Sequence, residues 1–277
     1  MLNPSLWVIG AEGDKEDDTM QTRTEKGGKN SEGPIGTGLV IERRFTTVGE
    51  DPFDQFDWIE MDVEIRNADG SLAHRIDDVR LPSGFSGVAG KVLAQKYLRK
   101  AGVPAILRKV KEKGVPTWLQ RSEPDHEKLQ SLDPEKRFIG ESHGRELFRR
   151  LAGTWTYWGW KHGYFEAEAD ARAYFDEMCY LIASQRSAPN SPQWFNTGLH
   201  WAYGIEGPAQ GHRYIDPSTG ELMTSTNAYE HPQPHACFIQ SVSDSLVGGT
   251  DSIMGLWNRE ALLLSLIHIS EPTRLSV

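Results

Sequence analysis

Two short segments, residues 188–198 and residues 236–242, constrain the fold of this chain more than any other feature. The first contains Pro189 and Pro192, which resist regular structure, so we expect a turn-rich loop. The second is a short apolar run that predicts a strand, followed by a polar turn. A loop of small hydrogen-bonding residues beside a strand that carries Cys237 would form the floor of a substrate site.

The chain before residue 188 predicts a mainly helical region with one β-hairpin. Residues 58–66 alternate apolar and charged side chains, which is typical of a half-buried strand. A turn at residues 67–70 and a returning strand over 72–81 complete the hairpin, with a bulge near Asp77. Helices are expected over residues 87–100, 142–162 and 166–186 and from near Asp251, with a proline-broken connector over 104–134 that holds at most one short helix.

The composition excludes several classes of protein. The chain has 277 residues, a formal net charge of -9 and a pI near 5.5, which is a poor match to a nucleic acid polymer as partner. Two cysteines are too few for a secreted disulfide scaffold and suit a reducing cytoplasm. No signal pattern and no membrane-spanning apolar run is present.

Three local patterns have a functional and a structural interpretation, and the structural one is preferred for each. Gly87 and Gly90 precede Lys91 as in a phosphate loop, but the position six residues before Lys91 is Phe85 and not glycine. The histidines between residues 200 and 235 match no zinc spacing, so no metal site is expected. Cys179 lies beside the apolar stripe of its helix, which predicts a buried structural thiol.

The two constraining segments resemble the start of the catalytic barrel of ribonucleotide reductases. The resemblance rests on Asn190-Ser191-Pro192 and on Ala236-Cys237, and it is strongest for the adenosylcobalamin-dependent, class II enzymes. It implies an α/β family whose catalytic domain is a ten-stranded barrel. In this chain it implies an α+β arrangement, in which a mostly helical N-terminal region with a hairpin precedes the first strand or strands of that barrel.

Four regions are therefore expected along the chain. Residues 1–40 are polar and predict a disordered tail, and residues 41–187 form the mainly helical domain. Residues 188–263 begin a catalytic barrel that is truncated here. Residues 264–277 are expected to be non-native, because Leu264 to Arg274 resembles the translation of a sequencing-library adapter.

The resemblance implies that the family reduces ribonucleotides, here ribonucleoside diphosphates, to deoxyribonucleotides for DNA synthesis. Ser191, Ala236 and Cys237 correspond to substrate-contacting positions, and Cys237 corresponds to the first of two thiols that reduce the ribose. A thiyl radical on a third cysteine removes the 3′ hydrogen, the 2′ hydroxyl leaves as water, and the thiol pair becomes a disulfide. The radical cysteine and the second thiol are expected beyond this chain, so the chain alone is expected to be inactive.

The same resemblance implies the cofactor and partners. Adenosylcobalamin would be the radical source, and a thioredoxin-like or other dithiol would be the reductant. Deoxynucleotide and ATP effectors would bind near Asp244, Ser245 and Leu246, close to a contact between the subunits of a homodimer. The alternative is a non-catalytic nucleotide-binding or interaction domain derived from a reductase.

Overall fold

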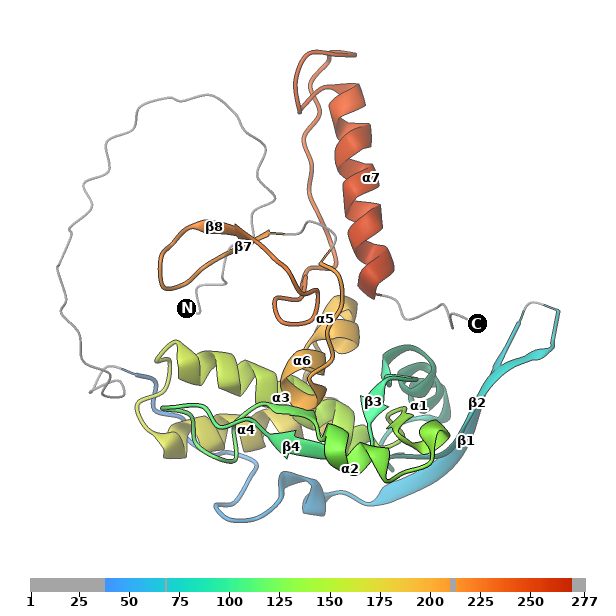
Figure 1. The fold of residues 1–277 in the computed structure, drawn as a ribbon, viewed down its shortest axis with the longest axis vertical. Helices are drawn as coiled ribbons and strands as arrows, with labels where there is room; N and C mark the ends of the chain where they lie inside the picture. Colours follow the sequence, from blue (N-terminus) through green and yellow to red (C-terminus); the bar gives the residue numbers. More distant parts are fainter. Residues whose placement is uncertain (1–37, 68, 210–212, 271–277) are drawn as a thin grey trace.

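The computed structural model describes residues 38–67, 69–209 and 213–270. Helices and small sheets form a body (Figure 1). The last helix, α7 (Ile253–Ser270), and the segment before it, from Ala236 onward, project from that body and are called the arm. Each sheet among the described residues has two antiparallel strands, so no barrel is formed by them. Of the expected tail, only residues 38–40 are described, and there the N–H of Leu39 donates to the carbonyl of Tyr164 at 2.8 Å.

The predicted hairpin consists of β1 (Trp58–Arg66) and β2 (Leu72–Pro82). The register shifts between Met61, opposite Val79, and Val63, opposite Ile76. At this shift two residues of β2, Asp77 and Asp78, lie opposite one residue of β1, and Asp78 has a left-handed φ of 56°. The predicted bulge near Asp77 is therefore confirmed.

The predicted helices are present with shorter bounds. The first is α1 (Gly87–Val92), continued by a π-helical turn, Leu93–Tyr97. The hydroxyl of Ser86 accepts the N–H of Ala89 at 3.1 Å and so caps α1. The two long helices are α3 (Gly144–Lys161) and α4 (Glu168–Ala183).

The main core lies between the hairpin, α3 and α4. Its fully buried members include Leu81 from β2, Phe148 and Leu151 from α3, and Cys179 and Ile182 from α4. Cys179 is a buried free thiol, as predicted, and burial raises its pKa well above the usual value. This thiol belongs to the packing of the domain.

The inner face of α4 also carries two acidic residues that hold the chain entering the domain. Asp176 accepts the guanidinium of Arg43 at 2.8 Å, and Glu177 accepts the backbone N–H of Thr46 at 2.9 Å and its hydroxyl at 2.7 Å. The helical pattern does not predict these contacts, because both residues would be assigned to a solvent-facing position. They fix residues 43–46 against α4.

The connector between α1 and α3 contains the predicted short helix and several short strands that its polar sequence did not predict. The strands pair β3 with β6 and β4 with β5. The bounds are β3 (Val103–Pro104), β4 (Leu107–Lys109), β5 (Ser122–Pro124), α2 (His126–Gln130), a 3₁₀ turn (Pro134–Lys136) and β6 (Phe138–Ile139); another 3₁₀ turn, Pro52–Gln55, precedes β1.

Two predictions after residue 187 are wrong in part. The segment 188–198 contains a short helix, α5 (Ser191–Asn196), which tolerates Pro192 because that residue occupies the first turn, where a missing N–H costs nothing. The expected strand over 236–242 is not formed, and among the described residues no strand pairs with the backbone of this segment. The remaining elements are α6 (Leu199–Tyr203), β7 (Arg213–Ile215), β8 (Leu222–Thr224) and α7 (Ile253–Ser270).

Candidate functional site

Ser191 is the first residue of α5 and is exposed. Its hydroxyl lies 3.4 Å from the hydroxyl of Tyr97, which is the last residue of the π-helical turn. Pro192 follows it, and Asn190 precedes it in an extended conformation. The serine hydroxyl is therefore presented to solvent from a stiff turn, beside a tyrosine from a different element.

Aromatic packing fixes α5 on the body. The ring of Tyr97 is stacked on Trp194 and also contacts Phe195, with ring centroids 5.3 Å apart in both pairs. The indole of Trp194 donates to the carbonyl of Pro189 at 2.9 Å, and the indole of Trp155 donates to the side chain of Gln193 at 2.9 Å. These contacts come from α3 and from the π-helical turn, so the segment with Ser191 is held from two directions.

The backbone just after α5 approaches α3 so closely that only glycine fits at position 198. Gly198 has a φ of 89°, and a Cβ there would lie 2.4 Å from the carbonyl oxygen of Arg150. Thr197, just before it, is fully buried. The backbone after Ser191 is thereby pinned against the middle of α3.

Cys237 lies in the arm and is an exposed free thiol. Ala236 is also exposed, and both lie in an irregular stretch of the chain. Just before them, Gln233 accepts the N–H of His235 at 2.7 Å and donates to its carbonyl at 3.0 Å, which closes a local turn. The expected position of Cys237 on a buried strand is not observed in this structure.

The stretch expected to bind effectors packs against the start of α7. The carbonyl of Ser245 accepts the N–H of Ile253 at 2.9 Å, and the carbonyl of Leu246 accepts the N–H of Met254 at 3.2 Å. Asp244 and Leu246 are exposed. The backbone of this stretch therefore satisfies N–H groups that the helix itself leaves unpaired.

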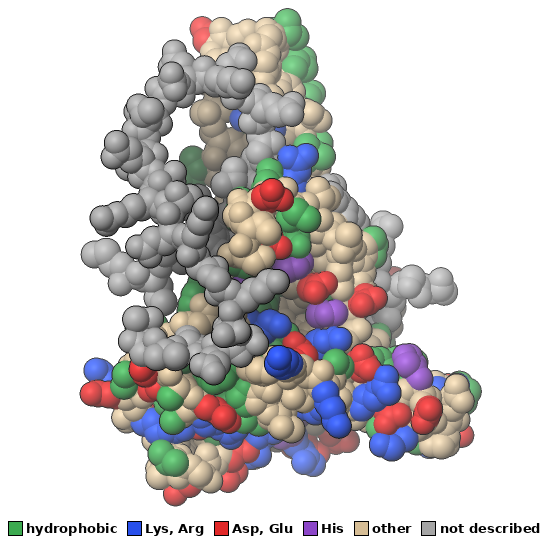
Figure 2. All heavy atoms as spheres, turned by 60° about the vertical axis from the view of Figure 1, so that its left-hand side comes forward, with side chains coloured by type: hydrophobic (Ala, Val, Ile, Leu, Met, Phe, Trp, Pro, Cys, Tyr) green, Lys and Arg blue, Asp and Glu red, His purple; other side chains and the backbone are tan. Residues whose placement is uncertain are grey.

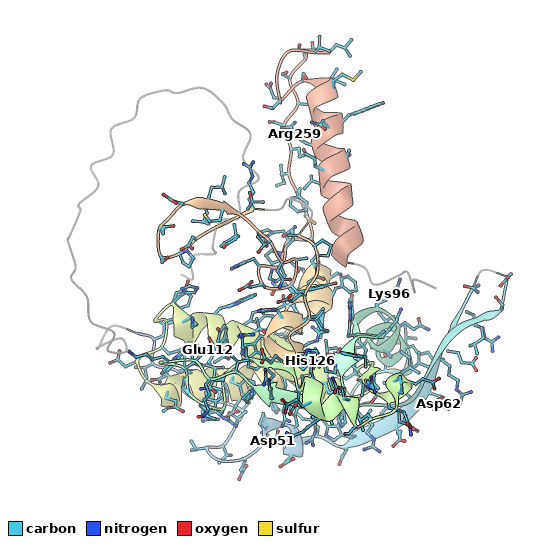
Figure 3. The ribbon with its side chains drawn as sticks, viewed as in Figure 1. Asp51, Asp62, Lys96, Glu112, His126 and Arg259 are labelled. Atoms are coloured by element: carbon cyan, nitrogen blue, oxygen red, sulfur yellow. The ribbon has the colours of Figure 1, made fainter. Side chains whose placement is uncertain are left out.

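The arm is held together mainly by its own contacts. Arg259, labelled on α7 in Figure 3, donates from its guanidinium to the carbonyl of Ser241 at 2.6 Å. Among the described residues, no hydrogen bond, ion pair or ring contact joins Ser191 to Cys237. The joint site predicted from the two segments therefore stays a prediction.

A third feature, not predicted from the sequence, connects several of these elements. Arg150 lies on α3, and Glu141 lies shortly before the start of α3. Both are almost fully buried, and they form an ion pair with a nitrogen–oxygen distance of 2.6 Å. The sequence offered no signal for it, because a charged residue within a helix usually predicts a solvent-facing position.

The described residues show no arrangement suited to a metal ion. No group of three or more His, Cys, Asp or Glu side chains is suitably arranged in the part of the chain that the structure describes. Two cavities among the described residues have volumes of about 440 and 430 Å³, the size of a small-ligand pocket. Neither is lined by Ser191 or Cys237. No described helix has the length and apolar character needed to cross a membrane.

Comparison with known proteins identifies the family. A family model described as class II vitamin B12-dependent ribonucleotide reductase matches residues 60–185, which include most of the hairpin and all of α3 and α4 and end before Ser191. This stretch defines the N-terminal region of a ribonucleotide reductase. The chain belongs to the class II, vitamin B12-dependent family of these enzymes.

Individual relatives support the assignment. The vitamin B12-dependent ribonucleotide reductases of Bradyrhizobium diazoefficiens and Agrobacterium fabrum are each 57% identical over 225 residues, which is 81% of this chain and 18% of the relative. The enzyme of Rhodopirellula baltica is 29% identical over 227 residues, or 82% of this chain and 18% of the relative. The chain therefore spans about 18% of the length of these relatives.

Proposed function

We propose that this chain is the N-terminal part of an adenosylcobalamin-dependent reductase that converts ribonucleoside diphosphates to 2′-deoxyribonucleotides. The observation that carries the proposal is the 57% identity over 225 residues to two vitamin B12-dependent ribonucleotide reductases. The described residues by themselves are expected to be inactive. We attribute radical generation to parts of the protein outside them, because the chain spans about 18% of the length of its relatives.

Ser191 is proposed to bind the substrate. Its exposed hydroxyl can donate to a phosphate oxygen of a nucleotide without a bulky side chain between them. The exposed position of Ser191 on a turn held by Tyr97 and Trp194 supports this role. Ala236, a small residue beside the reacting cysteine, is proposed to allow close approach of the ribose.

Cys237 is proposed to be one of two thiols that reduce the ribose. In this step the 2′ hydroxyl leaves as water, and the two thiols lose two electrons and two protons and become a disulfide. The second thiol has to come from outside the described residues, because Cys179 is buried in the core between α3 and α4. A thioredoxin-like or other dithiol would reduce the disulfide after each turnover.

Regulation and assembly follow from the same proposal. Adenosylcobalamin, when bound, supplies the radical that activates a further cysteine. Deoxynucleotide or ATP effectors would bind near Asp244, Ser245 and Leu246, and the complete enzyme would form a homodimer. The backbone of Ser245 and Leu246 already caps α7, so an effector there would act on the start of that helix.

The test begins with the gene. The locus is amplified from source DNA with a primer beyond the codon for Glu260, which also tests whether residues 264–277 belong to the natural protein. The full-length product is then assayed with adenosylcobalamin, a dithiol and ribonucleoside di- or triphosphates. We expect Cys237→Ser to abolish multiple turnover, by about a thousandfold or more, because one electron-donating thiol is lost.

Cys179→Ala is the matched control, since it removes the buried thiol and should leave turnover within a few-fold of the parent. Near-normal turnover of Cys237→Ser with a dithiol would show that Cys237 is structural. A natural gene that encodes Leu264 to Arg274 and then stops would instead support a short, non-catalytic protein, and the reductase proposal would be withdrawn.

A further inference from the structure

The guanidinium of Arg150 caps the carbonyl end of α5. It donates to the carbonyl of Thr197 at 2.8 Å and to that of Trp194 at 3.0 Å. A third carbonyl, that of Tyr97, accepts from the same group at 3.2 Å. All three acceptors are backbone groups at the ends of helical turns, where the helix supplies no donor of its own.

Glu141 makes the burial of this cation tolerable. Its carboxylate accepts from Nε of Arg150 at 2.6 Å and from the hydroxyl of Tyr203 at 2.7 Å. It also accepts the backbone N–H of Arg99 at 2.8 Å. Both charges are paired and hydrogen-bonded, which is the condition for keeping an ion pair away from water.

The helix that receives these bonds cannot hold its own shape. α5 has six residues, and isolated helices of this length are unstable in water. Its start carries Ser191, and the partner of Ser191 is the hydroxyl of Tyr97, whose carbonyl Arg150 also binds. One buried side chain therefore fixes the helix with Ser191 and the residue that contacts Ser191.

We infer that Arg150, neutralised by Glu141, is a positioning residue for the substrate-binding turn at Ser191. It does not contact the substrate and acts by holding α5 and Tyr97 in one arrangement. The role in substrate binding rests on the proposed function of Ser191. The mechanical part, the fixing of α5, does not depend on that function.

The mechanical part is tested in the 277-residue chain by amide hydrogen exchange. The variant is Arg150→Met with Glu141→Gln, which removes both charges; the amide oxygen of the glutamine can accept the N–H of Arg99, and its NH2 can donate to the hydroxyl oxygen of Tyr203. A single change at Arg150 would leave a buried unpaired carboxylate and risk unfolding the domain. We expect exchange at the amides of residues 194–197 to rise about tenfold or more, because the capping bonds are lost.

The control is Arg43→Met with Asp176→Asn, which removes another ion pair with a buried carboxylate, on α4. It should leave exchange in residues 194–197 within about twofold of the parent. If the Arg150 variant raises the exchange rates of the amides of residues 194–197 no more than the α4 variant does, the inference is wrong. The amides of β2, which neither variant alters, serve as a common reference for global stability in both proteins.

The functional part is tested by a double-mutant cycle in the full-length reductase. Ser191→Ala should raise KM for the ribonucleoside diphosphate about tenfold, as expected for a lost hydrogen bond to a charged group. The Arg150 and Glu141 double variant should raise KM by a similar factor with a smaller change in kcat. Adding Ser191→Ala to it should change KM by less than about twofold, because the serine is already misplaced.

Multiplicative effects on KM would mean that Arg150 does not act through Ser191, and the functional inference would be overturned. No effect of Ser191→Ala alone would overturn the proposed role of that serine. The exchange result at residues 194–197 would still decide whether Arg150 positions α5, so the two failures can be distinguished.

Discussion

At the scale of single residues, the two cysteines show how environment separates a structural thiol from a reactive one. Cys179 has no exposed surface, and burial raises its pKa well above the usual value, so its thiolate is scarce at neutral pH. Cys237 is exposed and free. The same thiol group is therefore expected to react readily at Cys237 and slowly at Cys179.

A thiol-specific reagent at neutral pH should modify Cys237 of the native 277-residue chain rapidly. Cys179 should react only after denaturation, with a rate at least about a hundredfold lower in the native state, because the core must open first. Mass spectrometry of digested protein identifies the labelled cysteine. Cys237→Ser should abolish the fast phase; rapid native labelling of Cys179 would contradict the described core.

A second residue-scale prediction concerns Gly198. Gly198→Ala forces a Cβ into the carbonyl of Arg150 at a left-handed φ, and should lower the free energy of unfolding by about 2–4 kcal/mol. Gly220→Ala is the matched control, because Gly220 also has a positive φ, 74°, but open space around it. It should cost only about 1 kcal/mol. Urea denaturation of both variants checks the difference, and equal losses would show that the close approach at α3 is unimportant.

At the scale of elements, the start of α3 carries a pH-sensitive cap. The side chain of His143 accepts the N–H of Arg145 through Nδ1 at 3.1 Å. Burial and the nearby charges of Arg145, Arg80 and Arg149 lower the pKa of His143 below its ordinary value. A protonated ring could not accept this bond, so the folded protein favours the neutral histidine.

The stability of the domain should therefore fall as the pH drops below about 6.5, the ordinary pKa of histidine. In that range the unfolded chain takes up a proton that the folded chain excludes, and the loss levels off below the folded pKa. His143→Asn retains a side-chain cap and should reduce this dependence between pH 7 and pH 5. Thermal unfolding at several pH values measures it.

His162→Gln serves as the control at the other end of α3. Burial and Lys161 lower the pKa of His162 as well, so part of the pH dependence belongs to it. The variant should retain the part due to His143. If His143→Asn keeps the full pH dependence of the parent, the cap does not titrate in the way described.

The elements also show which parts of the structure the sequence could predict. The hairpin with its bulge, α3 and α4 follow from local apolar periodicity, and they were predicted within a few residues. The helix α5 depends on Arg150 and Trp194, and Arg150 lies more than forty residues away in sequence. Local pattern predicted a loop there, because the stabilising contacts are not local.

The candidate site was predicted less completely than the fold, for the same reason. Ser191 and Cys237 were selected by family resemblance, and their exposure was not evident from the pattern of residues. Arg150 and Glu141 were missed, because nothing in the order of residues shows that two charges will be buried together. Their partners come from separate elements that only folding brings together.

At the scale of the whole molecule, the body and the arm differ in surface chemistry. Acidic and basic side chains mix over the body, whereas the arm shows few charges and has apolar side chains along one edge (Figure 2). Its exposed apolar residues lie both on the irregular segment and on α7: Ile239, Val242, Leu246, Val247, Ile253, Met254, Trp257 and Leu262. Such an extended apolar surface favours self-association.

We expect the 277-residue chain to bind a hydrophobic dye and to elute as associated species at micromolar concentration. A chain that ends at His235 should lose most dye binding, elute as a monomer and unfold at a similar temperature, because the core of the body lies before that residue. Val88→Lys is the control, since Val88 is 75% exposed on the body and contributes no extended patch. It should leave dye binding nearly unchanged. Dye fluorescence measures the exposed apolar surface, and size-exclusion chromatography measures the association. If the shortened chain associates as strongly as the 277-residue chain, the surface responsible for self-association lies on the body and not on the arm.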